Sequence, residues 1–430
     1  MNDVDGRPRP PSRFATVLAL SLGNAIEIYD FTVYSFFSLT IGKLFFPVQS
    51  EFGPLLLALL TFGIGFVVRP LGGIVIGAYA DRAGRRPALV LTIALMALGT
   101  LLIGLCPTYA DIGLLAPAAI VVGRCLQGFS AGGEIGVATT FLMELGRPSG
   151  RGLRVSWQMA SQGAAALCGA LSGYILTTTL PPGALEAGVW RIPFLVGLLI
   201  IPVGLYARWS LPETAVGGRR QTVILRNLVS GHGRTLFAGV LMIMGGTAST
   251  YVNIYYMPTY LIKTIALPPQ SAFLAGCFAG ATLLIVAPLA GRLSDRLGSR
   301  RPFVFWSWLG TAVLTYPAFW VVVQTQSATA ALVAFVVLIG FNAAGSGSCL
   351  IMVMENFPRG VRATGLSVVY SVGVSVFGGF APFIVTWLIS VSGNPMSPAW
   401  YVTACATAAL FGVTRLRERT EPEGAVPVQR

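Results

Sequence analysis

The chain has 430 residues, of which 54% are hydrophobic and only 10% are charged, and its formal net charge is +13. Soluble proteins carry about 25% charged residues, so this composition excludes an ordinary set of water-soluble domains. The positive charge does not indicate nucleic-acid binding, because the basic residues lie in short clusters between long apolar runs. The sequence therefore predicts an all-α membrane protein.

Apolar runs long enough to cross a bilayer, about 20 residues each, recur along the whole chain. They cover residues 14–39, 54–79, 88–106, 113–142, 155–178, 191–210, 235–261, 269–291, 303–323, 329–353, 366–390 and 399–416. We therefore expect twelve transmembrane helices in two six-helix bundles, residues 1–212 and 234–430. A polar cytoplasmic linker over 213–233 joins them, and we expect its single histidine, His232, to be a solvated loop residue.

Two charged motifs are repeated about half a chain apart. The stretch GAYADRAGRR at 77–86 is echoed by GRLSDRLGSRR at 291–301. An acidic and a basic residue at 144 and 151 are likewise echoed at 355 and 362. Matching features at a nearly constant offset predict an internal duplication, so each half is one copy of a larger unit.

The distribution of Lys and Arg predicts the orientation of the helices in the membrane. Of the 29 basic residues, 24 lie at alternate ends of the apolar runs. They fall in residues 1–13, 82–86, 147–154, 208–234, 292–301 and 359–362 and in the C-terminal tail. Only Lys43, Arg191 and Lys263 lie at the other ends. Because basic loops stay inside, we expect both termini to be cytoplasmic in a protein of the inner membrane.

The repeated loop motif and the twelve runs in two halves resemble the major facilitator superfamily. Within it, GNAIEIYDF at 23–31, RPLG at 69–72 and GRCLQGFSAGGE at 123–134 resemble the metabolite:proton symporter family. SEF at 50–52, GAY at 77–79 and GNPMSPAW at 393–400 are similar to the citrate and tricarballylate transporters. The proline/betaine branch commonly carries a long charged C-terminal tail, which we do not expect in this chain.

The resemblance implies a secondary transporter rather than an enzyme. It implies proton-coupled symport of a small organic carboxylate, such as citrate or tricarballylate, by alternating access. The expected partners are this anion, protons and the lipid bilayer, with no nucleic acid, no cofactor beyond protons, and a monomeric protein. Symport of a dicarboxylate, shikimate or a zwitterionic osmolyte such as proline or betaine is an alternative. A membrane receptor that does not transport is a second one.

Five charged residues fall within the apolar runs of the first half: Glu27, Asp30, Arg69, Arg124 and Glu134. A charge at the centre of a bilayer costs about 2.5–3.5 kcal/mol even on permissive insertion scales, so each one needs an explanation. Polar residues at similar depth in the second half are neutral. This asymmetry predicts that the first half carries the ionic chemistry of the protein.

Arg124 is predicted to lie near the middle of the membrane, with Gln127 and Glu134 on the same face of a continuous helix. Asn24, Glu27 and Asp30 form a second polar stripe at spacings of three residues. A guanidinium can hold a carboxylate through two parallel hydrogen bonds. The predicted substrate-binding residues are Arg124, Arg69, Gln127, Asn24, Asn342 and Tyr255.

Asp30, Glu27 and Glu134 are the predicted proton-coupling residues, with Asp30 the first choice. Alternatives remain for each charge. Asp30 or Glu27 neutralises Arg124 and holds the bundle together, Glu134 serves gating or packing, and Arg69 belongs to a kink beside Pro70.

The loop motifs are predicted to control access to the site, because an aspartate near a helix end can pair with the opposite half in only one conformation. The predicted gating residues are Asp81, Arg82, Arg85, Arg86, Glu144, Asp295, Arg296 and Arg362. One histidine and six cysteines without ligand spacing predict no metal site. A phosphate-binding loop for ATP is absent from the sequence.

Overall fold

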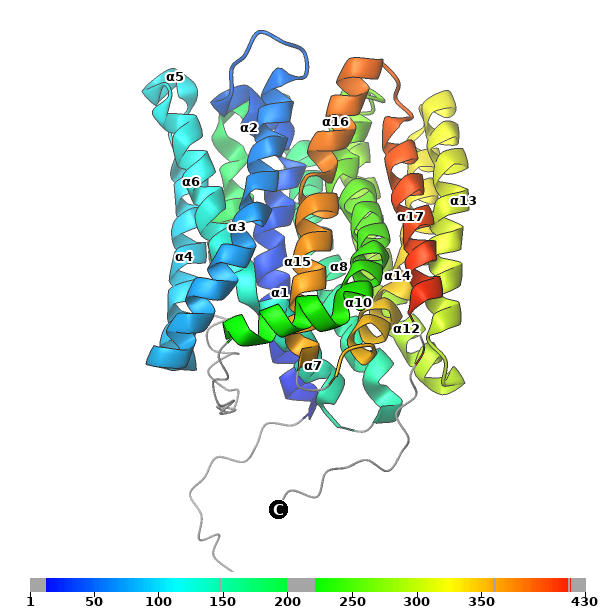
Figure 1. Cartoon of the computed structure of the whole chain (residues 1–430). Coiled ribbons are helices and arrows are strands. Elements are labelled where there is room, and N and C mark those ends of the chain that lie inside the picture. The colour runs from blue at the N-terminus through cyan, green and yellow to red at the C-terminus, as the bar shows by residue number, and fades with distance from the viewer. Residues whose placement is uncertain (1–12, 147, 199–220, 359–360, 417, 419–430) are drawn as a thin grey trace, which may run out of the picture.

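A computed structural model describes residues 13–146, 148–198, 221–358, 361–416 and 418. Within these ranges only the backbone is described at 13–15, 81, 85–86, 133–138, 148 and 221–230. The described chain is built from helices that run roughly side by side (Figure 1). The start of α1 and the end of α17 lie toward the same end of this bundle.

The first half contains most of the helices predicted for it, with two breaks that the sequence did not predict. Its helices are α1 (Arg13–Phe36), α2 (Ser38–Phe45), α3 (Gly53–Ala83), α4 (Arg85–Leu105), α5 (Tyr109–Ile112), α6 (Leu115–Ser130), α7 (Glu134–Glu144) and α8 (Arg151–Thr179). The run 14–39 divides at Phe37 into α1 and α2. The run 113–142 is interrupted by a 3₁₀ turn, η1 (Ala131–Gly133). Glu134 therefore begins a new helix and does not share the helical face of Arg124, which corrects the predicted continuous arc.

In the second half, two long spans contain a π-helical turn. The elements are α10 (Gln221–Thr250), η4 (Tyr251–Tyr256), α11 (Met257–Lys263), α12 (Pro269–Leu297), α13 (Arg301–Thr325), α14 (Ala328–Glu355), α15 (Arg362–Val374), η6 (Ser375–Gly379), α16 (Ala381–Ser392) and α17 (Ser397–Arg415). The π turns are η4 and η6. Such turns often occur at functional sites, because the extra residue re-aims the side chains.

The predicted linker lies partly outside the described residues. Where it is described, α10 is already helical from Gln221, and a kink with φ −130° and ψ 23° falls at His232. Figure 1 shows the first part of α10 lying across one end of the bundle before the chain turns into it. The predicted loop around His232 is therefore wrong, since this residue lies at a bend inside a helix.

Eight helices in the described part of the chain are long and apolar enough to cross a membrane. They match eight of the twelve predicted runs. Of the other four, the first contains Glu27 and Asp30 in α1, and the fourth is the interrupted one. The sixth is described only as far as residue 198, and the twelfth corresponds to α17 of 19 residues.

The seam between the two halves is formed mainly by α8 and α12, which pack backbone to backbone. A Cβ added at Gly291 would lie 2.5 Å from the carbonyl oxygen of Gly152, and one at Gly280 would lie 2.6 Å from the amide nitrogen of Leu167. Small residues allow this close approach, which drives helix association where lipid offers no hydrophobic gain. The repeat of glycines along both helices therefore holds the two halves together.

Candidate functional site

Glycines bring α6 against α3 and α4 in the first half. A Cβ at Gly128 would overlap the carbonyl oxygen of Gly65 on α3. A Cβ at Gly99 on α4 would lie 2.6 Å from the carbonyl oxygen of Gly123. Because only glycine fits at these contacts, α6 is held close to both neighbours, and Arg124 is enclosed among α1, α3 and α4.

Arg124 is fully buried, with 0% of its surface exposed. Its guanidinium carbon lies 4.4 Å from the ring centre of Phe31, 4.5 Å from that of Tyr34 and 5.1 Å from that of Phe62. Its Nη1 donates a 2.8 Å hydrogen bond to Gln127 Oε1. Nε and Nη2 have no hydrogen-bond partner within the described residues. Aromatic faces stabilise the cation but leave these two donors available to an anion.

Arg69 on α3 has a similar environment and lies close to Arg124. Its guanidinium carbon is 4.4 Å from the ring centre of Phe31 and 4.2 Å from that of Phe66. Its Nη2 lies 3.5 Å from Glu27 Oε1. The two guanidinium carbons share the Phe31 ring, so they are at most twice 4.4 Å, or 8.8 Å, apart. Two buried cations at this separation can be bridged by one molecule with several carboxylates.

Asp30 is connected to Arg124 through a chain of hydrogen bonds. Thr100 Oγ1 on α4 donates to Asp30 Oδ2 at 2.5 Å. Gln127 Nε2 donates to the same hydroxyl oxygen at 2.9 Å, and Gln127 Oε1 accepts from Arg124. All of these side chains are buried. The predicted Asp30, Gln127 and Arg124 are therefore brought together, whereas Glu27 pairs with Arg69.

Sequence reasoning missed Thr100, which lies in the middle of the hydrogen-bond chain between Asp30 and Arg124. A single threonine in an apolar run carries no functional signal, because its hydroxyl usually bonds a carbonyl of the preceding turn. Thr100 does make that bond, to Met96 O at 3.0 Å. Only the packing of α4 against α1 and α6 reveals its second set of partners.

Asn24 ties α1 to α8 within the first half. Its Nδ2 donates to Ser161 Oγ at 2.7 Å and to the carbonyl oxygen of Gln158 at 3.2 Å. Its Oδ1 has no hydrogen-bond partner in the described part of the chain. The amide nitrogen that could have contacted a substrate thus holds two helices together.

The second half contributes neutral polar groups around a small cavity of about 30 Å³. Asn342 lines it and donates to Thr250 Oγ1 at 2.7 Å. Gln162 of α8 lines it from the first half, and Tyr255 donates to Gln162 Oε1 at 3.5 Å. Tyr251 joins the cavity to the arginine cluster, because its ring centre lies 5.5 Å from that of Phe66. One water needs about 10–15 Å³, so this cavity has room for roughly two waters.

Asp295, a predicted gating residue near the end of α12, contacts the opposite half. Its carboxylate accepts hydrogen bonds from the backbone N–H of Gly152 at 2.7 Å and of Leu153 at 2.9 Å. These are the second and third residues of α8, whose first N–H groups have no partner inside the helix. A carboxylate there is also favoured by the helix dipole. Asp295 thus joins the halves through a helix end rather than through an arginine.

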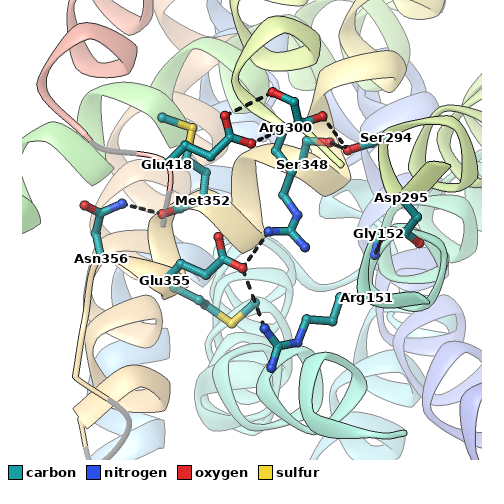
Figure 2. Close-up of polar contacts among 12 residues, drawn as sticks. Arg151, Gly152, Ser294, Asp295, Arg300, Ser348, Met352, Glu355, Asn356 and Glu418 are labelled. Carbon is teal, nitrogen blue, oxygen red and sulfur yellow. Dashed lines mark hydrogen bonds and ion pairs between the residues drawn. The ribbon is translucent and has the colours of Figure 1, made fainter. Parts of the chain in front are cut away.

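Glu355 forms a second contact beside Asp295, and Figure 2 shows it between two arginines. Its Oε1 lies 2.6 Å from Arg300 Nη1 and 3.8 Å from Nη1 of Arg151, a first-half residue. The carboxylate of Glu418, just after α17, accepts from Ser299 Oγ at 3.0 Å and from the backbone N–H of Arg300. We call Asp295, Glu355, Arg300 and Arg151, with the amides of α8, the charged clasp.

The remaining predicted gating residues are less engaged or are not described. Arg362 Nε donates to the carbonyl oxygen of Met354 at 3.0 Å, a contact within the second half. Arg82, Glu144 and Arg296 are exposed. The side chains of Asp81, Arg85, Arg86 and Glu134 lie outside the described ones.

The halves also touch at the end opposite the charged clasp. Lys263 Nζ lies 3.1 Å from Glu51 Oε1, and the hydroxyls of Ser38 and Thr259 are 3.2 Å apart. Nearer the middle of α3, Ser375 of η6 donates to the carbonyl oxygen of Phe66 at 2.9 Å. The described halves are therefore in contact at both ends of the bundle, on either side of the arginine cluster.

Long apolar helices in two halves, with charges buried inside the bundle, are typical of a multi-pass membrane transporter. The family model for "Sugar (and other) transporter" matches residues 15–216, and that for "Major Facilitator Superfamily" matches residues 240–430. A citrate-proton symporter of Salmonella typhi is 36% identical over 94% of this chain and 94% of its own length. The chain therefore belongs to the major facilitator superfamily.

Other relatives are named after different transported substrates. A citrate-proton symporter of Klebsiella pneumoniae is 35% identical over 95% of this chain and 93% of its own length. A proline/betaine transporter of Escherichia coli K12 is 31% identical over 96% and 85%. Among solved structures, a D-xylose-proton symporter has a TM-score of 0.75 at 19% identity and covers 93% of this chain and 97% of that one. That likeness concerns the fold alone.

Proposed function

We propose that the protein is a proton-coupled symporter of small organic carboxylates, with citrate as the first candidate. In this proposal twelve helices cross the cytoplasmic membrane in two bundles, 1–212 and 234–430, with both termini in the cytoplasm. The protein works as a monomer and needs no cofactor besides protons. Two relatives named citrate-proton symporters support the substrate class.

The observation that carries the proposal is that the guanidinium groups of Arg69 and Arg124 both lie against the ring of Phe31. Arg124 keeps Nε and Nη2 without a partner among the described residues, and they lie on adjacent corners of a planar fork. A carboxylate accepts two parallel hydrogen bonds from such a fork. Arg69 lies within 8.8 Å, twice the 4.4 Å from each guanidinium carbon to the Phe31 ring centre. A di- or tricarboxylate therefore reaches both.

Charge balance links anion binding to protons. In the described cluster, Glu27 and Asp30 balance Arg69 and Arg124, so the formal charge is zero before substrate arrives. An anion adds uncompensated charge in a buried site, and this is unfavourable at low dielectric. Protonation of Asp30 compensates one of the negative charges that the substrate brings and removes a carboxylate that competes with it for Arg124. Proton and anion therefore bind together, with Asp30 as the coupling residue and Glu27 as its alternate.

Alternating access would follow from breaking one set of end contacts at a time. The charged clasp joins α8 to α12 and α14 at one end, and Lys263 with Glu51 joins the halves at the other. Transporters of this architecture rock one bundle against the other around a fixed central site. The predicted gating residues at the clasp would thus control which side is open.

Counterflow of labelled citrate in proteoliposomes tests the proposal. We expect exchange of internal for external citrate at equal pH, and accumulation when the side facing the substrate is made more acidic. A receptor that binds without transporting gives no exchange. Exchange that is unaffected by any pH gradient would refute proton coupling, and absence of both binding and exchange would refute the carboxylate substrate.

A zwitterion is the second candidate substrate, because the described charge cluster is neutral and some relatives are named proline/betaine transporters. A neutral zwitterion would leave the balance of the cluster unchanged. Adding unlabelled proline or betaine to the citrate exchange separates the two candidates. Strong competition by either, with none by tricarballylate, would favour the osmolyte.

A further inference from the structure

We propose that Thr100 reads the protonation state of Asp30 and transmits it to Arg124 through Gln127. This inference rests on the proposed proton coupling at Asp30 and assigns it a relay residue on a helix, α4, that carries none of the buried charges. The relay is a hydroxyl that has two alternative acceptors. Its geometry follows from three hydrogen bonds that meet at the buried Thr100 Oγ1 and a fourth that joins Gln127 to Arg124.

Thr100 Oγ1 has one hydrogen and two acceptors within reach. Asp30 Oδ2 lies at 2.5 Å and the carbonyl oxygen of Met96 at 3.0 Å. The oxygen itself accepts from Gln127 Nε2 at 2.9 Å. A hydroxyl offers one donor and two lone pairs, so it cannot satisfy both acceptors at once. The hydrogen must therefore point either to Asp30 or to Met96.

Protonation of Asp30 decides between these two orientations. When Asp30 is ionised, Thr100 donates to its carboxylate, which is the stronger acceptor. When Oδ2 takes up a proton from water, the new O–H donates to Thr100 Oγ1, and the hydrogen of Thr100 turns to the carbonyl of Met96. Each group keeps its hydrogen count except Asp30, which gains one. The rearrangement needs a rotation of one hydroxyl and no change in the backbone.

The orientation of Thr100 changes the strength of its bond to Gln127. A hydroxyl that donates to a carboxylate becomes a better acceptor, because hydrogen bonds in a chain polarise one another. Gln127 is then held to Thr100, and its Oε1 holds Nη1 of Arg124 at 2.8 Å. When Thr100 instead accepts from protonated Asp30, it holds Gln127 less strongly. Nη1 of Arg124 is then held less strongly at the moment when the charge of Asp30 is removed, so the guanidinium can turn to align its Nε and Nη2 with a substrate carboxylate.

The surroundings of Asp30 leave this relay as its main route to Arg124. Its Oδ1 faces the 191–198 helix at Gly197, where an added Cβ would lie 2.8 Å away. The titratable neighbours are Tyr29 on α1, whose hydroxyl donates to the Pro193 carbonyl at 3.1 Å, and Arg124 on α6. Glu27, one turn earlier on α1, is paired with Arg69.

The test is Thr100→Val, which keeps the shape of the side chain and removes the hydroxyl. The assay uses proteoliposomes and labelled citrate. We expect Thr100→Val to retain exchange at equal pH, whereas the accumulation driven by a pH gradient should fall at least tenfold. Its citrate affinity should also lose its dependence on pH. Thr100→Ser, which restores the hydroxyl, should recover both properties. Thr100→Ala replaces Thr100→Val if the latter does not fold.

Thr92→Val is the matched control. Thr92 lies on the same helix, is buried, and its hydroxyl donates to the backbone carbonyl of Leu89 at 2.8 Å. We expect Thr92→Val to couple citrate accumulation to the pH gradient as the unmodified protein does. Thr100→Val with unchanged gradient-driven accumulation and unchanged pH dependence would overturn the relay.

A second measurement separates this inference from the proposed function. The infrared band of the protonated Asp30 carboxyl, identified by its loss in Asp30→Asn, reports the hydrogen bond from Asp30 to Thr100 without any substrate. We expect Thr100→Val to shift this band and Thr100→Ser to leave it near its original position. If citrate is not transported at all, the proposed function fails, while a band that Thr100→Val does not move refutes the relay.

Discussion

The two halves of the molecule differ in where they bury their charges. In the first half, Arg69, Arg124 and Asp30 lie in the middle of their helices and contact aromatic faces and neutral side chains. In the second half, the half-buried Asp295 and the buried Glu355 lie near the ends of α12 and α14, where they contact amides and arginines. The two halves, which the sequence predicts to be repeats, therefore place their charges differently. The first buries them within its helices, and the second places them near helix ends that contact the other half.

Two equivalent residues show this divergence most simply. Glu144 and Glu355 occupy matching places in the duplicated sequence, each at the end of a helix. Glu144 is exposed, whereas Glu355 is only 3% exposed and lies against two arginines. The basic residues of the two motifs also differ in their partners: Arg362 Nε donates to the Met354 carbonyl, whereas Arg151, its counterpart, lies 3.8 Å from Glu355 of the other half. Matching positions in the two halves therefore have different contacts.

The largest effect is expected from removing the central cation of the first half. Arg124→Ala should lower citrate affinity by about 100-fold or more, because it removes two charge-assisted hydrogen bonds of about 1.5–3 kcal/mol each. Arg124→Lys should fall in between, since lysine lacks the fork. Equilibrium binding of labelled citrate measures both. Arg191→Ala is the control, because its guanidinium also lies over an aromatic ring, 4.9 Å from the centre of Trp190.

A double variant tests whether Arg124 only neutralises Asp30. If so, Arg124→Ala combined with Asp30→Asn should regain nearly the original citrate affinity. Full rescue would remove Arg124 from the substrate site and break the contrast between the halves. We expect no rescue beyond a few-fold.

The next largest effect concerns proton coupling in the first half. Asp30→Asn mimics the protonated acid, so it should lower the accumulation driven by a pH gradient at least tenfold, while citrate exchange at equal pH continues. Glu27→Gln should reduce it less, because Glu27 is paired with Arg69. The measurement compares gradient-driven uptake with exchange in the same proteoliposomes. Accumulation that persists in both variants would show that the coupling residue lies elsewhere.

A smaller effect is expected at the charged clasp of the second half. Asp295→Asn weakens a carboxylate that caps α8, and loss of such a cap costs about 0.5–2 kcal/mol. This shifts the balance between open and closed forms by about 2- to 30-fold, so transport slows while citrate affinity changes little. Double electron–electron resonance between labelled α8 and α12 measures the shift. Glu355→Gln should shift the same balance between open and closed forms. Glu144→Gln, at the exposed matching position, is its control. If both variants shift the balance equally, the two halves do not differ at these positions.

The smallest effect is expected at the opposite end. Lys263 and Glu51 form an ion pair across the halves, but the Glu51 side chain is 75% exposed. Exposed pairs contribute about 0.2–1 kcal/mol, so Lys263→Ala should change the transport rate by less than about fivefold. The difference should shrink further in high salt, because exposed charges are screened. An effect larger than that of Asp295→Asn would place the main gate at this end.

Sequence alone determined the class of the protein, its two-fold repeat and the residues that merit a functional explanation. These follow from local rules, because a bilayer requires long apolar helices and makes every charge inside them conspicuous. Arg124, Asp30 and Gln127 were found in this way, and the structure brings them together. The family followed from short motifs, which need no knowledge of packing.

Tertiary structure alone decided which partner each charge has. Glu27 pairs with Arg69, Thr100 connects Asp30 to Gln127, and Asp295 meets backbone amides of α8. These contacts join residues far apart in the chain, and they depend on glycines that let α6 approach α4 and α8 approach α12. A threonine or a glycine in an apolar run looks like any other small residue until its neighbours are in place. The 3₁₀ turn η1 and the π turn η4 were likewise visible only in the structure, because nothing in an apolar run marks a local change of helix type.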